Sequence, residues 1–149
     1  MSRVLGSGRD GLVTEDECLR RYGLKPRDDD LDEVRHILRA QAALERDRQG
    51  DGDTELMKLC CVQLFNVGLV DDVMAIWVAK ESSWDAHNSI DVQLLCGAGL
   101  AETKAHLAAQ GSETAAKALD YLLACEDAGD FEDFSVGKQS RWYADYYLG

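Results

Sequence analysis

The chain has 149 residues, of which 46% are hydrophobic and 30% are charged, and its formal net charge is −12. This composition is typical of a globular domain with one hydrophobic core, and no apolar run reaches the length of a membrane span. Nearly all of the charge imbalance lies in residues 51–149, which carry seventeen acidic and six basic side chains. Because such a surface repels nucleic acids and anionic lipids, we expect a basic protein partner, with no nucleic acid and no membrane.

The N-terminal residues differ in character from the rest. Residues 1–12 are predicted to form a flexible leader, without a hydrophobic stretch long enough for a signal peptide. Residues 13–149 are predicted to form a single α-helical domain. The five cysteines show no CxxC spacing, and four of them stand among apolar residues, so we expect reduced thiols in a core rather than disulfides. These features together predict a cytoplasmic protein.

The domain is predicted to be all-helical because it has one proline and few clusters of β-branched residues. A capping box, TEDE at 14–17, opens the first helix, and Asp53 or Thr54 caps the third. Gly68 ends this third helix, whose run ELMKLCCVQLF is apolar on most sides and is expected to be central and buried. The helices predicted in this half span about 15–22, 31–48, 54–67 and 69–80.

The second half of the domain is expected to add four more helices. The residues ESSWDAHN (81–88) are predicted to be a loop, and Ser89 is expected to cap the helix after it. Glycines separate the next elements, and Ser112 caps the longest of them. These helices are predicted over about 90–97, 100–110, 113–128 and 138–147.

Two segments resemble one another at an offset of 31 residues. QLFNVGLVDDVMAIW (63–77) aligns with LLCGAGLAETKAHL (94–107), which places Gly68 on Gly99 and an acid in the next turn of both. Glycine permits the left-handed conformation in which helices often end, and an acid suits the N-terminus of the next helix. A period near 30 predicts stacked antiparallel helical hairpins, as an α-solenoid-like array or a compact helical bundle of about seven or eight helices.

The segment GLAETKAHLAAQG (99–111) resembles the second helix of an ankyrin repeat, from glycine to glycine at the spacing of that family. The family's Thr-Pro-Leu-His opening is replaced here by the residues IDVQ (90–93), and bulky residues replace its paired small alanines. The resemblance therefore implies a divergent ankyrin-like α-hairpin repeat protein.

Two short patterns bear on chemistry. Gly97 and Gly99 lack the third glycine, the preceding strand and the Gly-Lys-Ser/Thr of a phosphate loop, so they are interpreted as a break between helices. His87, with Asp85 and Asp91 near it in sequence, forms the one local cluster able to bind a metal or move a proton. Because no HxxxH or CxxC spacing supports a site, we expect polar capping residues in a loop, with no catalytic residue, metal or cofactor.

Aromatic and acidic residues gather in two regions and predict a binding surface. Two tryptophans bracket the segment after the fourth helix, and tryptophan and tyrosines crowd the C-terminus. Aromatic rings among acids are typical of an interface that captures a basic protein. The predicted partner-binding residues are Asp71, Asp72, Trp77, Glu81, Trp84, Asp85, His87, Glu126, Asp127, Asp130, Trp142, Tyr143 and Tyr146.

These features favour a non-enzymatic protein-binding protein. Small, acidic, all-helical chains without catalytic residues are similar to bacterial immunity proteins and antitoxins, a likeness that implies neutralisation of a basic toxin. The alternative is a helical-repeat scaffold or regulatory adaptor that holds a peptide or helix in a hairpin groove. An enzyme centred on His87 is the third hypothesis, and it needs Asp85 and Asp91 to converge with His87 in a pocket.

Overall fold

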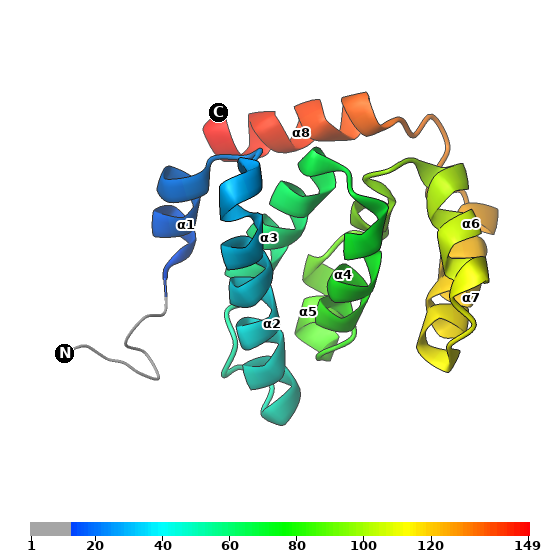
Figure 1. The fold of residues 1–149 in the computed structure, drawn as a ribbon, viewed down its shortest axis with the longest axis horizontal. Coiled ribbons are helices and arrows are strands. Elements are labelled where there is room, and N and C mark those ends of the chain that lie inside the picture. Colours follow the sequence, from blue (N-terminus) through cyan, green and yellow to red (C-terminus); the bar gives the residue numbers. More distant parts are fainter. Residues whose placement is uncertain (1–12) are drawn as a thin grey trace.

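The fold of residues 13–149, the part of the chain that the computed structural model describes, is helical throughout (Figure 1). The leader predicted at 1–12 lies outside these described residues. The predicted all-α class is confirmed, with eight α-helices and three short 3-10 helices in the described part of the chain. None of the helices within 13–149 is long and apolar enough to cross a lipid bilayer.

The elements follow one another with short connections. The first half contains α1 (Glu15–Tyr22), η1 (Asp28–Asp30), α2 (Leu31–Asp47), α3 (Thr54–Val67) and η2 (Val70–Asp72). The second half contains α4 (Val73–Lys80), α5 (Trp84–Ser89), η3 (Val92–Cys96), α6 (Leu100–Gln110), α7 (Glu113–Asp127) and α8 (Val136–Leu148).

Local capping explains why several helices begin where the sequence predicts. At α1, the Glu17 N–H donates to Thr14 Oγ1 at 3.1 Å, and the Thr14 N–H donates to Glu17 Oε1 at 3.0 Å, which completes the predicted capping box. Asp53 and Ser112 cap α3 and α7 through bonds of 3.0 and 3.1 Å from main-chain N–H groups. Each cap satisfies donors that the first turn of a helix leaves without a partner.

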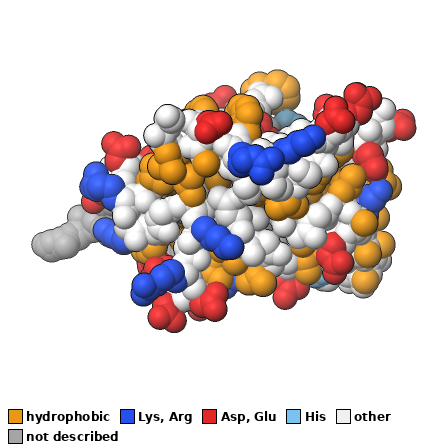
Figure 2. Space-filling view, turned by 90° about the horizontal axis from the view of Figure 1, so that it is seen from above, with side chains coloured by type: hydrophobic (Ala, Val, Ile, Leu, Met, Phe, Trp, Pro, Cys, Tyr) orange, Lys and Arg blue, Asp and Glu red, His pale blue; other side chains and the backbone are white. Residues whose placement is uncertain are grey.

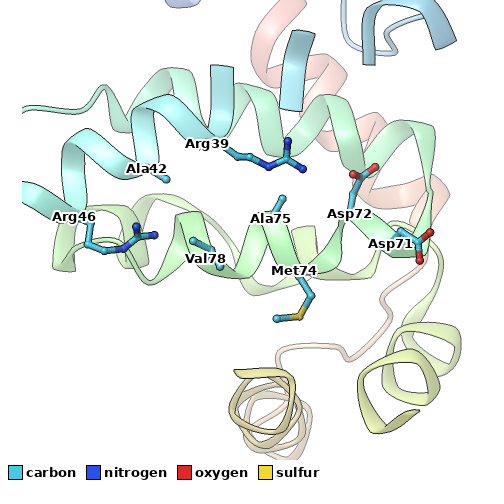
Figure 3. Close-up of a pocket in the computed structure, with 8 residues that line it drawn as sticks. All are labelled: Arg39, Ala42, Arg46, Asp71, Asp72, Met74, Ala75 and Val78. Carbon is cyan, nitrogen blue, oxygen red and sulfur yellow. The ribbon is translucent and has the colours of Figure 1, made fainter. Parts of the chain in front are cut away.

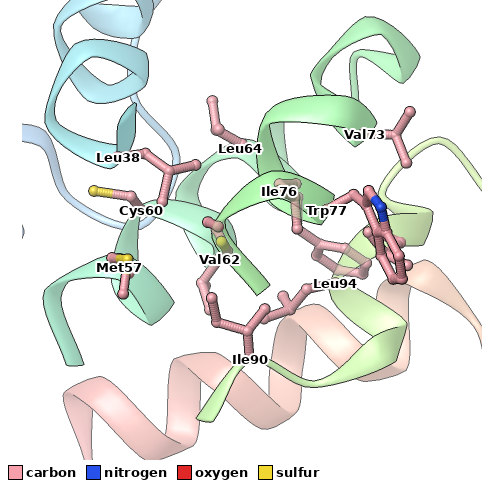
Figure 4. Close-up of a cluster of buried hydrophobic side chains, with 14 of the residues drawn as sticks. Leu38, Met57, Cys60, Val62, Leu64, Val73, Ile76, Trp77, Ile90 and Leu94 are labelled. Atoms are coloured by element: carbon pink, nitrogen blue, oxygen red, sulfur yellow. The ribbon is translucent and has the colours of Figure 1, made fainter. Parts of the chain in front are cut away.

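The central helix is α3, as its apolar sequence predicts. All of residues 56–65 except Lys58 are buried, and the helix packs against α1, α2, α5 and α8. Figure 4 shows its side chains meeting Leu38 of α2 and Ile76 of α4 in one cluster. Burial of each such aliphatic side chain stabilises the fold by about 1.5–3 kcal/mol, so α3 holds α1, α2, α5 and α8 together.

Two pairs of consecutive helices pack side by side, α2 with α3 and α6 with α7 (Figure 1). The helix α4 packs mainly against α2 and α5. The last helix, α8, runs across the top of Figure 1 and contacts α3. The result is a compact helical bundle in which α4 and α5 lie between the two pairs.

The region between α4 and α6 differs from the sequence prediction in two ways. The predicted loop at 81–88 contains the helix α5, because Ser83 Oγ accepts a main-chain N–H of its first turn at 3.0 Å. The helix predicted over 90–97 is only the five-residue η3, because Ile90 and Asp91 adopt extended backbone conformations before it.

The glycines Gly68 and Gly99 are not equivalent, which contradicts the predicted correspondence of the two similar segments. Gly68 ends the 14-residue α3 in the left-handed conformation, with φ 82° and ψ 22°. Gly99 follows the short η3 with φ 101° and ψ 152°. A Cβ atom on Gly97 would lie 2.6 Å from the main-chain oxygen of Phe65, so the end of η3 packs directly on the end of α3. The break at 97–99 therefore provides close packing and a change of direction.

Candidate functional site

The site begins with Trp84, the first residue of α5. Trp84 is 70% exposed, the largest value among the large hydrophobic residues of 13–149. Its main-chain N–H donates to Gln49 Oε1 at 3.1 Å, and its ring stacks on the His87 ring with centroids 6.3 Å apart. A tryptophan held in this way presents a large apolar area to a partner and loses little conformational freedom on binding.

The His87 ring connects α5 to its neighbours through both of its nitrogens. Nδ1 lies 2.8 Å from Glu81 Oε2, and Nε2 lies 3.3 Å from the Tyr121 hydroxyl of α7. The His87 and Tyr121 rings also meet edge to face, with centroids 5.3 Å apart. These contacts fix α5 against α7, although their residues are far apart in sequence.

A shallow hollow of about 290 Å³ extends this group toward the turn after α7. His87, Tyr121 and Asp130 are among the residues that line it, and the Gln93 side chain donates to the main-chain oxygen of Asp130 at 2.8 Å. We name the whole group the Trp84 surface. It comprises Glu81, Trp84, Asp85, His87, Tyr121 and Asp130.

A buried lysine supports the Trp84 surface from below. Lys80 is 3% exposed, and its Nζ donates to the main-chain oxygens of His87, at 2.6 Å, and of Ile90. The ammonium also lies 5.7 Å from the centroid of the Tyr121 ring. Burial lowers the pKa of Lys80, while the nearby carboxylates of Asp91 and Glu81 act in the opposite direction. The lysine thereby binds the carbonyl groups at the C-terminal end of α5 and fixes its position.

A buried carboxylate holds the other end of α5. Glu45 of α2 is 1% exposed and accepts hydrogen bonds from Ser83 Oγ at 2.6 Å and from the N–H groups of Gly50 and Gly52, both at 3.0 Å. Burial opposes ionisation of Glu45, but these three donors outweigh it and lower its pKa. Because Ser83 caps α5, Glu45 positions the residue directly before Trp84.

The two chain segments that meet at the Trp84 surface are acidic. Residues 81–103 carry four acidic side chains and no lysine or arginine, and residues 118–137 carry six acidic side chains and again no lysine or arginine. The contacts of His87 with Tyr121 and of Gln93 with Asp130 bring these two stretches together. The fold therefore joins two cation-free segments around one exposed tryptophan.

Three residues of the predicted binding surface belong to the interior instead. Asp72 is buried because its carboxylate pairs with the Arg35 guanidinium through bonds of 2.7 and 3.1 Å. Trp77 packs against Tyr121 with ring centroids 5.5 Å apart and is 6% exposed. Tyr143 is fully buried, and its hydroxyl donates to the Asp91 carboxylate at 2.6 Å. These three side chains are not available to a partner.

The remaining predicted residues are exposed or half-buried outside the Trp84 surface. Asp71 lies 3.9 Å from a His106 nitrogen of α6, and Glu126 forms an ion pair of 2.9 Å with Lys104. Asp127 is exposed at the end of α7.

Trp142 and Tyr146 form a separate aromatic pair on α8. Their rings stack with centroids 5.8 Å apart, and each residue is 53% exposed. The Lys58 ammonium lies 5.0 Å from the centroid of the Tyr146 ring. Figure 2 views the molecule from the α8 side and shows Lys and Arg side chains beside Asp and Glu across this face. This pair therefore lies on a surface of mixed charge.

The cluster proposed for an enzyme is brought together only in part, because His87 and Asp91 line the same hollow and Asp85 does not. The His87 nitrogens contact Glu81 and Tyr121. The Asp91 carboxylate instead accepts from Tyr143 and lies 4.0 Å from the Lys58 ammonium. No group of three or more His, Cys, Asp or Glu side chains within 13–149 is placed to hold a metal ion.

Sequence reasoning missed three residues that build this site. No local pattern pairs Tyr121 with His87, which lies 34 residues away. In the sequence, Glu45 looks like one polar residue among several at the end of a helix, and Lys80 like a cation in the last turn of another. Their bonds to Ser83 and to the His87 carbonyl oxygen join different elements of the fold, and no local pattern predicts them. The placement of Lys80 after the apolar run VMAIWVA is the one signal that could have indicated a buried ammonium.

Comparisons with protein families, with curated proteins and with solved structures returned no match to this chain. The ankyrin-like and immunity-type resemblances of the sequence therefore stay predictions. The function of the chain is inferred from its own contacts and charges.

Proposed function

We propose that this chain is a protein-binding protein that captures a positively charged partner through the Trp84 surface. The observation that carries the proposal is the joining of two cation-free acidic segments around a tryptophan that is 70% exposed. Tryptophan is enriched among the residues that dominate binding energy, and surrounding carboxylates select and steer a cationic partner.

The support beneath the surface suits this role. Lys80 and Glu45 hold the two ends of α5, and the His87 ring braces Trp84. A partner that binds here meets a preorganised helix and so avoids much of the ordering cost that weakens flexible interfaces. The carboxylates of Glu81, Asp85 and Asp130 then provide attraction that decreases as salt concentration rises.

In its most specific form, the proposal is that the chain acts as an immunity protein or antitoxin against a basic toxin. A toxin that acts on nucleic acid needs a cationic surface, and an acidic partner that covers this surface blocks substrate binding. The carboxylates of the Trp84 surface would give this chain the negative charge that an inhibitor of such a toxin needs.

The proposal is tested by capture from an extract of the cells that produce the chain. The wild-type chain serves as bait beside Trp84→Ala and the double variant Glu81→Lys with Asp130→Lys, and Trp142→Ala is the matched control on α8. We expect wild type and Trp142→Ala to retain a protein of pI above about 9, and both Trp84-surface variants to retain it at least about tenfold less. Equal retention by all four chains, or capture of an acidic protein alone, contradicts the proposal.

A further inference from the structure

A second open surface lies between α2 and α4, where a groove of about 410 Å³ runs along both helices (Figure 3). Arg39, Ala42 and Arg46 line it from α2, at positions three and seven residues apart. Met74, Ala75 and Val78 line it from α4 with a similar helical spacing. Two parallel stripes of side chains therefore form the walls and floor of the groove.

The two arginines on the α2 wall lack acidic partners. Neither Arg39 nor Arg46 has a carboxylate within 4.0 Å among the described residues. The positions three and four residues from each of them in α2 carry no Asp or Glu either. Arg35, in the same helix, is by contrast bound to Asp72. Asp71 and Asp72 also line the groove, but the Asp72 carboxylate is bound to Arg35. The groove thus offers two arginines that form no ion pair among the described residues.

The floor between these arginines is small and apolar. Ala42 and Ala75 let a third backbone approach closely, and Val78 is 38% exposed. A groove between two packed helices with small residues at its base accepts the ridge of a third helix. An amphipathic helix is therefore the shape that the groove fits best.

We propose that this groove binds an acidic amphipathic helix of a second partner protein. Arg39 and Arg46 are seven residues apart, which is about 10.5 Å along α2. A partner helix that lies along α2 matches them with two carboxylates at the same seven-residue spacing, and its apolar stripe covers Ala75 and Val78.

The exposed Asp71 sets the direction of the bound helix. Its side chain is 91% exposed at the end of the groove nearer Arg39 (Figure 3). The N-terminus of a helix carries a partial positive charge, so the partner helix places this end toward Asp71 and its carboxylates toward the arginines.

This surface takes a partner of the opposite charge from the one proposed for the Trp84 surface. With both surfaces occupied, the chain acts as an adaptor between a cationic and an anionic protein. The groove proposal rests on Arg39, Arg46 and the α4 stripe alone, and it stands or fails independently of the Trp84 surface.

The test uses the full chain and a labelled helical peptide of about 18 residues, or about five turns. The peptide carries leucines in one apolar stripe and two glutamates seven residues apart, and its binding is followed by fluorescence anisotropy. The variant Arg39→Glu with Arg46→Glu is compared with Arg20→Glu plus Lys117→Glu, which changes the net charge equally at exposed sites on α1 and α7. Circular dichroism confirms that each variant is folded.

We expect the groove variant to bind the glutamate peptide at least tenfold more weakly than wild type, and the control variant to change binding less than twofold. A peptide with lysines in place of the two glutamates should bind the groove variant more tightly than wild type. Equal affinity of all chains for both peptides, or no binding by wild type, overturns the proposal. A dimer of the chain that dissociates in the groove variant, without peptide binding, also overturns it and assigns the groove to self-association.

Discussion

The Lys80 ammonium donates a hydrogen bond of 2.6 Å to the main-chain oxygen of His87. This bond crosses from the end of α4 to the end of α5, and the same ammonium also binds the Ile90 oxygen. Lys80 thus satisfies carbonyl groups that the short helix α5 leaves without partners, and it fixes the helix that carries Trp84.

Replacement of Lys80 by methionine tests this contact. Lys80→Met keeps the length of the side chain but leaves buried carbonyl oxygens without a donor, so the free energy of unfolding should fall by about 1–3 kcal/mol. Urea unfolding measures the change. The control variant Lys117→Met, at an exposed site on α7, should change the free energy of unfolding by less than about 0.5 kcal/mol. A Lys80→Met chain as stable as wild type shows that the two hydrogen bonds contribute nothing to the fold.

The buried Glu45 predicts a dependence of stability on acid pH. Its pKa is below the ordinary value of 4.5 in the folded chain because the bonds from Ser83, Gly50 and Gly52 outweigh the effect of burial. A carboxylate with a lowered folded pKa stabilises the fold at pH above its unfolded pKa, and this stabilisation is lost as the pH falls through the folded pKa.

The variant Glu45→Gln removes this titration. At neutral pH the variant should be about 1–3 kcal/mol less stable than wild type, and the difference should shrink as the pH falls below about 4.5. Urea unfolding over a pH series measures the difference in the free energy of unfolding at neutral pH and its change at acid pH. Glu33→Gln, at an exposed site of α2, is the control. A constant difference at every pH contradicts the assigned role of the Glu45 charge.

Gly97 and Gly137 provide a matched pair of glycine positions. A Cβ on Gly97 would lie 2.6 Å from the Phe65 oxygen and 2.9 Å from the Phe65 Cα, so Gly97→Ala should destabilise the chain by about 1–3 kcal/mol. Gly137 stands in the first turn of α8, with its nearest neighbour at an ordinary 3.7 Å. Gly137→Ala should therefore stabilise the chain by about 0.5–1 kcal/mol. Thermal unfolding should show a lower melting temperature for Gly97→Ala and a higher one for Gly137→Ala than for wild type. A Gly97→Ala chain that is as stable as wild type contradicts the close packing of η3 on α3.

The cysteines predict a low thiol reactivity of the folded chain. All five are buried as free thiols, and burial raises the pKa of Cys61 and raises the pKa of Cys96 to about 12. The pKa of Cys18 is lowered by its hydrogen bond with Cys60, but Cys18 is fully buried, so a reagent cannot reach it in the folded chain. A disulfide reagent attacks thiolates, so the native chain should react slowly and the urea-unfolded chain should release five equivalents at once. Rapid modification of one thiol in the native chain indicates that its part of the core opens readily.

The sequence predicts the parts of this fold that depend on neighbouring residues. The capping box of Thr14 and Glu17, the cap at Asp53 and the end of α3 at Gly68 are local signals, and the structure confirms each of them. The helix α5 escaped prediction because six residues are too few for a periodic pattern. The close approach of Gly97 to Phe65 is a contact between the two similar segments, and no alignment of these segments contains it.

The candidate site was predicted less completely than the fold. Composition places Trp84, Glu81 and His87 among the predicted residues, because aromatic and acidic residue types can be recognised in sequence. Burial could not be read in the same way, so Asp72 and Trp77 were placed on the surface. The first is buried by its pairing with Arg35, which lies 37 residues away. The second is buried because its ring packs on Tyr121 of α7.

The most direct test of the central claim is the NMR spectrum of the ¹⁵N-labelled chain during titration with the captured basic partner. The indole N–H signals of Trp77, Trp84 and Trp142 report on the core, the Trp84 surface and α8 respectively. Binding through the Trp84 surface predicts large shifts of the Trp84 indole and of amides in 81–91 and 121–130, with Trp142 unchanged. Shifts confined to α8 and the Trp142 indole, with Trp84 unmoved, would contradict the account.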